Sequence, residues 1–112
     1  MEEVTKGRKG FYYLKEIIKN PDVHGVIVLD ESGNSVFEEV IFSISPVEKK
    51  EIADFLKGFN DDKKTIIYVF TRDKLVMFSK NPSKFKGFLI TIARKSVNLG
   101  FLRVYHQRFI EL

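Results

Sequence analysis

Residues 86–103 read KGFLITIARKSVNLGFLR, an apolar run followed by a basic break and a second apolar segment. The run from Phe88 to Ala93 has the length of a buried β-strand. Ser96 then predicts a helix N-cap, because its hydroxyl can accept a hydrogen bond from a free N–H group of the first helical turn. Gly100 falls inside this predicted helix, where it is less favourable than Ala by about 1 kcal/mol. It therefore predicts close packing of the helix on a sheet, and Gly100→Leu is expected to overpack the site.

The rest of the chain alternates apolar segments with turn signals. The clearest signal is Ser45-Pro46-Val47-Glu48, which predicts an N-cap, a proline in the first helical turn and a capping box. Ser32-Gly33-Asn34 predicts a hairpin turn. The predicted elements are helix 11–20, strands 25–30 and 35–43, helix 46–59, strands 65–71, 75–79 and 88–93, and helix 97–112.

Length and composition indicate one domain spanning residues 1–112, with residues 1–10 as a flexible lead-in. The chain has no cysteine, which excludes disulfides, thiolate catalysis and cysteine-ligated zinc. No apolar run approaches the roughly 20 residues of a membrane span. The start, MEEVTK, lacks the hydrophobic core of a signal peptide. A cytoplasmic protein without membrane attachment is expected.

The charge pattern favours a protein partner. The net charge is +4, but acids dominate between Glu38 and Asp62 and bases dominate from Lys63 onward. A surface with both signs suits self-association or protein binding better than a nucleic-acid groove. The solvent-facing side of the central helix is the candidate partner-binding surface, and its residues are Glu48, Glu51 and Asp54.

Catalytic constellations are not recognisable. His24 and His106 lack any ligand spacing and are interpreted as surface or structural residues. Glu38 and Glu39 are neighbours on a strand and point to opposite faces, so they cannot form an acid–base pair. Asp61-Asp62 is interpreted as a solvated turn. No nucleophile elbow and no phosphate-binding glycine loop is present, and we expect no catalytic residue, no cofactor and no metal.

Two segments carry a family resemblance. Residues 22–33, DVHGVIVLDESG, and residues 93–103, ARKSVNLGFLR, look like the opening and closing motifs of the Roadblock/dynein-light-chain family. The order α-β-β-α-β-β-β-α also resembles that family from Phe11 onward. The resemblance implies an α/β, profilin- or longin-like layered fold with a five-stranded antiparallel sheet. The first and third helices would cover one face of the sheet, and the central helix the other.

The resemblance also implies a function. Roadblock domains typically dimerise through the strand after the central helix and through that helix. It therefore implies a non-enzymatic homodimer that regulates or scaffolds a Ras-like small GTPase, with strand 65–71 at the sheet edge. The implied dimer-interface residues are Phe55, Phe59, Ile66, Tyr68 and Phe70.

Two alternatives remain open at this point. One is a nucleic-acid or small-ligand binding module, because bases and aromatic residues interleave and a sheet face with aromatic rings can hold a single strand. The residues concerned are Tyr12, Tyr13, Lys15, Lys63, Lys64, Tyr68, Arg103, Tyr105 and Arg108. The other is an enzyme with a dispersed site. A further basic surface, carrying Arg72, Lys74 and Lys80, is the second candidate for partner binding.

Overall fold

A computed structural model describes residues 11–41, 44–59, 63–83 and 85–112. The predicted lead-in 1–10, the end of the predicted strand 35–43 and the pair Asp61-Asp62 lie wholly or partly outside these ranges. The elements in order are η1 (Tyr12–Leu14), α2 (Lys15–Ile18), β1 (Val23–Asp30), β2 (Ser35–Val40), α3 (Pro46–Gly58), β3 (Thr65–Phe70), β4 (Lys74–Asn81), β5 (Gly87–Arg94) and α4 (Leu99–Ile110).

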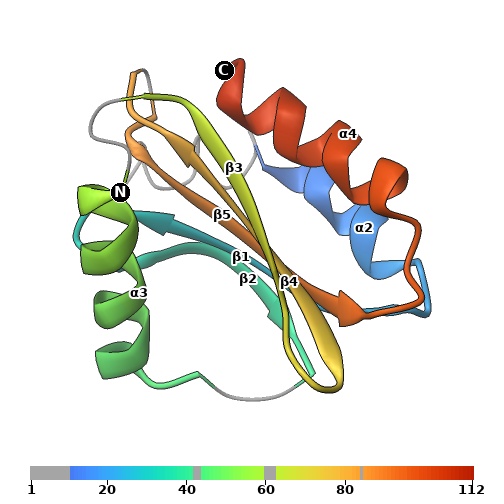
Figure 1. Cartoon of the computed structure of the whole chain (residues 1–112). Helices are drawn as coiled ribbons and strands as arrows, with labels where there is room; N and C mark the ends of the chain where they lie inside the picture. The colour runs from blue at the N-terminus through green and yellow to red at the C-terminus, as the bar shows by residue number, and fades with distance from the viewer. Residues whose placement is uncertain (1–10, 42–43, 60–62, 84) are drawn as a thin grey trace.

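The strands form one five-stranded antiparallel sheet in the order β2-β1-β5-β4-β3. Helices α2 and α4 cover one face and α3 lies on the other, as Figure 1 shows. This confirms the predicted fold class. Strand β3 is at one edge, as predicted, and β2 is at the other.

Strand alternation divides the core into two layers, because successive side chains of a strand point to opposite faces. The layer under α2 and α4 includes Val26, Met77 and Leu102, and the layer under α3 includes Ile27, Ile90 and Leu56. β1 and β5 contribute to both layers and are therefore buried along nearly their whole length. This explains why their sequences are continuous apolar runs.

Three details of the predicted helices are wrong. The first helix is only a 3-10 turn followed by the four residues of α2. The last helix begins at Leu99, and its N-cap is Asn98, whose side-chain oxygen accepts from Phe101 N at 3.2 Å. Asparagine caps a helix as well as serine does. Gly100 therefore lies in the first turn and is exposed.

Space around Gly100 also contradicts the close-packing interpretation. A Cβ built there would meet only the Asn98 side-chain oxygen, at 3.2 Å. The expected overpacking of Gly100→Leu therefore has no structural basis. Gly33 in the β1–β2 turn is a position that requires glycine. Its φ is +87°, and a Cβ there would lie only 2.7 Å from Lys50 Cα in the α3 backbone.

Helix α4 is fixed to the sheet by buried polar bonds. His106 is fully buried, and its Nδ1 and Nε2 each lie 2.8 Å from a hydroxyl oxygen, of Ser79 and Thr91 respectively. Asn81, also buried, donates from Nδ2 to the carbonyl oxygen of Phe109 at 2.8 Å. Burial lowers the pKa of His106 to about 3, so the ring is neutral at physiological pH.

Candidate interaction surfaces

Strand β3 is an uncharged edge. Its sequence, TIIYVF, contains no charge, proline or glycine, and three consecutive residues, Tyr68 to Phe70, are about half exposed. The opposite edge strand, β2, carries Glu38 and Glu39. Charged residues on an edge strand prevent pairing with another sheet, and an uncharged edge invites it. Of the two edges, β3 is the one suited to pair with a second chain.

Helix α3 covers only one end of its sheet face. Its first half approaches the β1–β2 turn at Gly33, and its carboxyl end is held by Lys80 Nζ, which donates to the carbonyl oxygens of Lys57 and Phe59 at 2.8 and 3.0 Å. The ladder register aligns one row of residues on this face, toward the ends of β1 and β2 that are farthest from the β1–β2 turn. That row is Val40, Gly25, Ile92, Val76 and Val69.

Two exposed phenylalanines belong to α3. Phe55 is 64% exposed and Phe59 is 40% exposed, and their ring centroids are 6.0 Å apart. Both project from the helix flank that also carries Ile52, whereas Lys50 and Lys57 project from the opposite flank and line hollows at the strand ends. Phe59 lies beside Thr65 and Ile67 of β3 around one small hollow, so the phenylalanine flank faces the β3 edge on this side of the sheet.

The structure divides the predicted dimer-interface residues between the two faces of the sheet. Ile66 packs against the layer under α4, and Tyr68 and Phe70 follow it on that face at two-residue spacing. Phe55 and Phe59 lie on the α3 face. The β3 residues that share their face are Ile67 and Val69, which sequence reasoning missed. Because all of Ile66 to Phe70 is apolar, the sequence shows no alternation that could separate the two sets.

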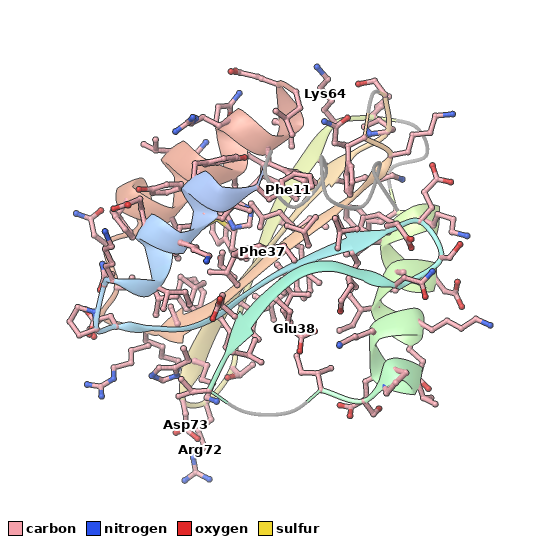
Figure 2. All side chains as sticks on the ribbon, turned by 180° about the vertical axis from the view of Figure 1, so that it is seen from behind. Phe11, Phe37, Glu38, Lys64, Arg72 and Asp73 are labelled. Carbon is pink, nitrogen blue, oxygen red and sulfur yellow. The ribbon has the colours of Figure 1, made fainter. Side chains whose placement is uncertain are left out.

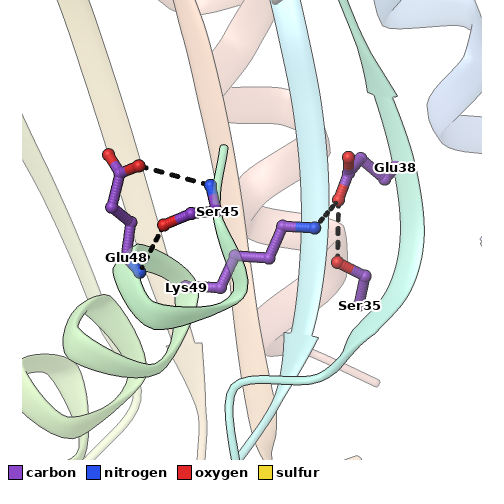
Figure 3. Close-up of polar contacts among 5 residues, drawn as sticks. All are labelled: Ser35, Glu38, Ser45, Glu48 and Lys49. Carbon is purple, nitrogen blue, oxygen red and sulfur yellow. Dashed lines mark hydrogen bonds and ion pairs between the residues drawn. The ribbon is translucent and has the colours of Figure 1, made fainter. Parts of the chain in front are cut away.

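The acids of the predicted partner-binding surface share α3 with the exposed lysines Lys50 and Lys57. Glu48, Glu51 and Asp54 are all exposed on α3. Glu48 is occupied in the capping box, where its Oε1 accepts from Ser45 N at 3.2 Å and its own N–H donates to Ser45 Oγ at 3.1 Å (Figure 3). Glu51 and Asp54 point outward from the helix without a structural bond of this kind. They are the two acids most available to a partner.

An ion pair ties α3 to the β2 edge. Lys49 Nζ contacts Glu38 Oε1, and Ser35 Oγ donates to the same oxygen at 2.8 Å (Figure 3). Partial burial would raise the pKa of Glu38, but the hydrogen bonds from Lys49 and Ser35 and the lysine charge outweigh it and hold that pKa below its usual value. Figure 2 shows Glu38 on the side of β2 that faces α3, with Phe37 directed to the other face.

The second candidate basic surface is not one surface. Arg72 and Lys74 lie at the β3–β4 turn, whereas Lys80 is at the other end of β4, roughly 20 Å away for six residues of strand. Lys80 is also buried and bonded to the end of α3. Figure 2 shows the turn residues Arg72 and Asp73 at the end of the molecule opposite Lys64.

Two tyrosines of the nucleic-acid alternative, Tyr13 and Tyr105, are engaged within the fold. The rings of Tyr13 and Tyr105 stack with centroids 6.4 Å apart, and the Arg108 guanidinium lies 4.4 Å from the Tyr13 centroid. Burial raises the pKa of Tyr13, partly offset by the Arg108 charge. Of the described tyrosine side chains in this set, Tyr68 alone is exposed, so the described residues present one tyrosine rather than a row of them for stacking with bases.

The described ranges contain no constellation that points to catalysis or metal binding. No group of three or more His, Cys, Asp or Glu side chains in them could hold a metal ion. His106 is enclosed between two hydroxyls and structural, and His24 is partly buried with no hydrogen-bond partner at Nδ1 among the described residues. None of the helices that the structure describes is long and apolar enough to cross a membrane.

Comparison with known proteins shows the fold. No family model matches the chain, and no curated protein sequence does. Among solved structures, the chain is similar to "MglB with tetrameric arrangement", with a TM-score of 0.62, 10% identity, and coverage of 98% of this chain and 84% of that one. It is also similar to the gliding protein MglB of Thermus thermophilus, with a TM-score of 0.59, 10% identity, and coverage of 96% and 82%.

Proposed function

We propose that this protein is a Roadblock-type homodimer that regulates or scaffolds a Ras-like small GTPase without being an enzyme itself. The dimer proposal rests on one observation, the uncharged β3 edge beside the exposed phenylalanine flank of α3. The similarity to MglB structures, one of them titled as a tetrameric arrangement, supports an assembling fold. The proposal of a small-GTPase partner rests on the resemblance of residues 22–33 and 93–103 to Roadblock motifs.

The geometry of an antiparallel β3–β3 pair supports the dimer. A two-fold axis beside β3 turns the partner's strand end for end, so the Val69 end of the partner's β3 lies beside the Thr65 end of the first chain, which is next to Phe59. Phe55 and Phe59 would then cover Val69 and Val76 of the second chain. The contact is self-complementary, as a two-fold interface requires.

Light scattering at micromolar concentration is expected to report about 26 kDa, twice the chain mass of 13.0 kDa. Val69→Lys places a charge on the pairing edge and is expected to yield the monomer at the same concentration. Glu39→Lys, an exposed change on the β2 edge, serves as the control and should keep the dimer. A monomeric wild type, or a Val69→Lys variant that remains dimeric, would show that the chains do not pair through β3.

The exposed acids of α3 are the proposed contact for the GTPase. Glu51→Lys with Asp54→Lys is expected to leave the fold intact and to slow association with the cognate GTPase. The effect should be larger at low salt, because exposed charges mainly steer association and are screened by ions. Stopped-flow association rates at two ionic strengths measure this.

The matched control for this charge reversal is Glu16→Lys with Glu111→Lys. These two exposed acids lie on α2 and at the end of α4, on the other face, and their reversal changes the net charge by the same amount. Equal slowing by both pairs would mean that only the overall charge matters. Unchanged rates at low salt for the α3 pair would exclude this surface as the binding site.

A further inference from the structure

On the face that α2 and α4 share, β3 is left without a helix of its own. α2 packs on β1 and α4 packs mainly on β4, and β3 lies beyond α4 at the sheet edge. Figure 1 looks onto this edge, with α4 on one side and α3 on the other. Tyr68 is 46% exposed and Phe70 is 54% exposed here, with their rings edge to face at 6.3 Å between centroids. An apolar sheet face is normally buried under another element.

The flank of α4 that faces β3 carries an arginine. Leu102 and Phe109 point to the sheet, and Tyr105 and Arg108 turn toward η1, where they contact Tyr13. With about 100° per residue, Arg103 lies on the opposite flank from Tyr105 and Arg108, on the side of β3. Its side chain is exposed.

The charge of this surface has one sign. Within β3 and α4 every charged side chain is an arginine, Arg103 or Arg108. Along the chain, the acids next to these elements are Asp73 in the β3–β4 turn, Glu111 just after α4, and Asp62 before β3, which lies outside the described residues. A partner that covers the tyrosine and phenylalanine rings would therefore meet positive charge along its side.

We propose that the surface made by Tyr68, Phe70 and Arg103 binds an acidic amphipathic helix of a partner protein. A helix placed over β3 would extend the α2–α4 layer by one member, with its apolar stripe on the two rings and its acids beside Arg103. The six residues of β3 span about 20 Å, which matches a helix of about 13 residues. The side chains of this surface point off the sheet face, so its occupant does not compete with strand pairing at the β3 edge.

This surface is on the opposite face from the acids proposed to contact the GTPase, and it exists on the single chain. The test uses a synthetic peptide of about 14 residues with leucines at helical spacing and glutamates elsewhere. A second peptide with lysine in place of each glutamate is the control. Binding is measured by isothermal calorimetry and by amide chemical shifts of the labelled full chain.

The acidic peptide is expected to bind at least about ten-fold more tightly than the basic one, with shifts along β3 and α4. Phe70→Ser and Arg103→Glu should each weaken its binding about ten-fold or more. Val47→Ser and Lys50→Glu, an exposed apolar side chain and an exposed base on the α3 side, should leave the affinity within about two-fold.

Equal binding of the two peptides, no binding up to millimolar concentration, or the same loss in Val47→Ser as in Phe70→Ser would overturn the proposal. The mass of each variant is measured alongside, because Phe70 lies in the edge strand proposed to pair. Should Phe70→Ser also dissociate the dimer, Arg103→Glu decides, since α4 takes no part in strand pairing. If the wild-type chain is monomeric and still binds the acidic peptide, the monomeric mass refutes the proposed dimer and the binding supports this surface.

Discussion

Lowering the pH from 7 to 5 is expected to remove about 2 kcal/mol from the free energy of unfolding through His106 alone. The pKa of this histidine is about 3 in the folded chain, against 6.5 in the unfolded chain. Between these values the unfolded state binds the proton and the folded state does not, so acid favours unfolding. The contribution is complete above pH 6.5 and is lost progressively as the pH falls toward 3.

Urea unfolding at fixed protein concentration, measured at several pH values between 4 and 8, checks this prediction. His106→Gln lacks this titrating group. Between pH 7 and pH 5 its free energy of unfolding should therefore fall by about 2 kcal/mol less than that of the wild type. Identical slopes for wild type and His106→Gln would refute the buried neutral ring.

The variant itself removes a ring bonded to two buried hydroxyls, of Ser79 and Thr91, and is expected to be less stable at every pH. If it does not fold, the imidazole of the wild type can be titrated directly by NMR. A His106 ring that becomes protonated near pH 6 would contradict the prediction without any variant.

Gly87→Ala is expected to destabilise the fold by about 3 kcal/mol or more, at the upper end of overpacking effects. A Cβ at Gly87 would lie well inside contact distance of the Leu29 carbonyl oxygen and the Phe85 ring. Neither neighbour can move freely. Gly87 is paired with β1 on one side and β4 on the other, and Phe85 packs against Phe11 and Phe109 with ring centroids 4.9 and 5.7 Å away.

Gly58→Ala is the matched control. A Cβ at Gly58, the last residue of α3, would meet nothing within 4 Å. Alanine should therefore be neutral or stabilise the helix by up to about 1 kcal/mol. Thermal melts of both variants test the pair. A Gly87→Ala melting temperature close to that of Gly58→Ala would mean that the sheet relaxes around the added methyl group.

The two proposed surfaces could be occupied together. The Phe55–Phe59 flank and the Tyr68–Phe70 pair lie on opposite faces of one sheet and meet only along the β3 edge. A second copy paired along the β3 edge, with its contacts to Phe55 and Phe59 on the α3 side, would leave the rings on the α4 side accessible. The same strand would then serve a homodimer at its edge and a partner helix on its α4 face.

Local sequence signals determined the elements and their order. The Ser45–Glu48 capping box, the Gly33 turn and the uninterrupted apolar runs of β1 and β5 each act over a few residues, so they are readable without tertiary contacts. The edge position of β3 also followed from the element order and the family resemblance. The Asn98 cap was missed because Ser96 and Asn98 are both good caps, and only the path of the β5–α4 connection selects between them.

Tertiary structure alone decided which residues share a surface. The apolar strand TIIYVF has no polar alternation, so its sequence cannot show that Ile67 and Val69 face α3 while Tyr68 and Phe70 face α4. Packing likewise buried His106 between Ser79 and Thr91, residues 27 and 15 positions away in the chain. Such pairings depend on the ladder register and on how the helices sit on the sheet. Both are set by the sum of many long-range contacts, which no short stretch of sequence encodes.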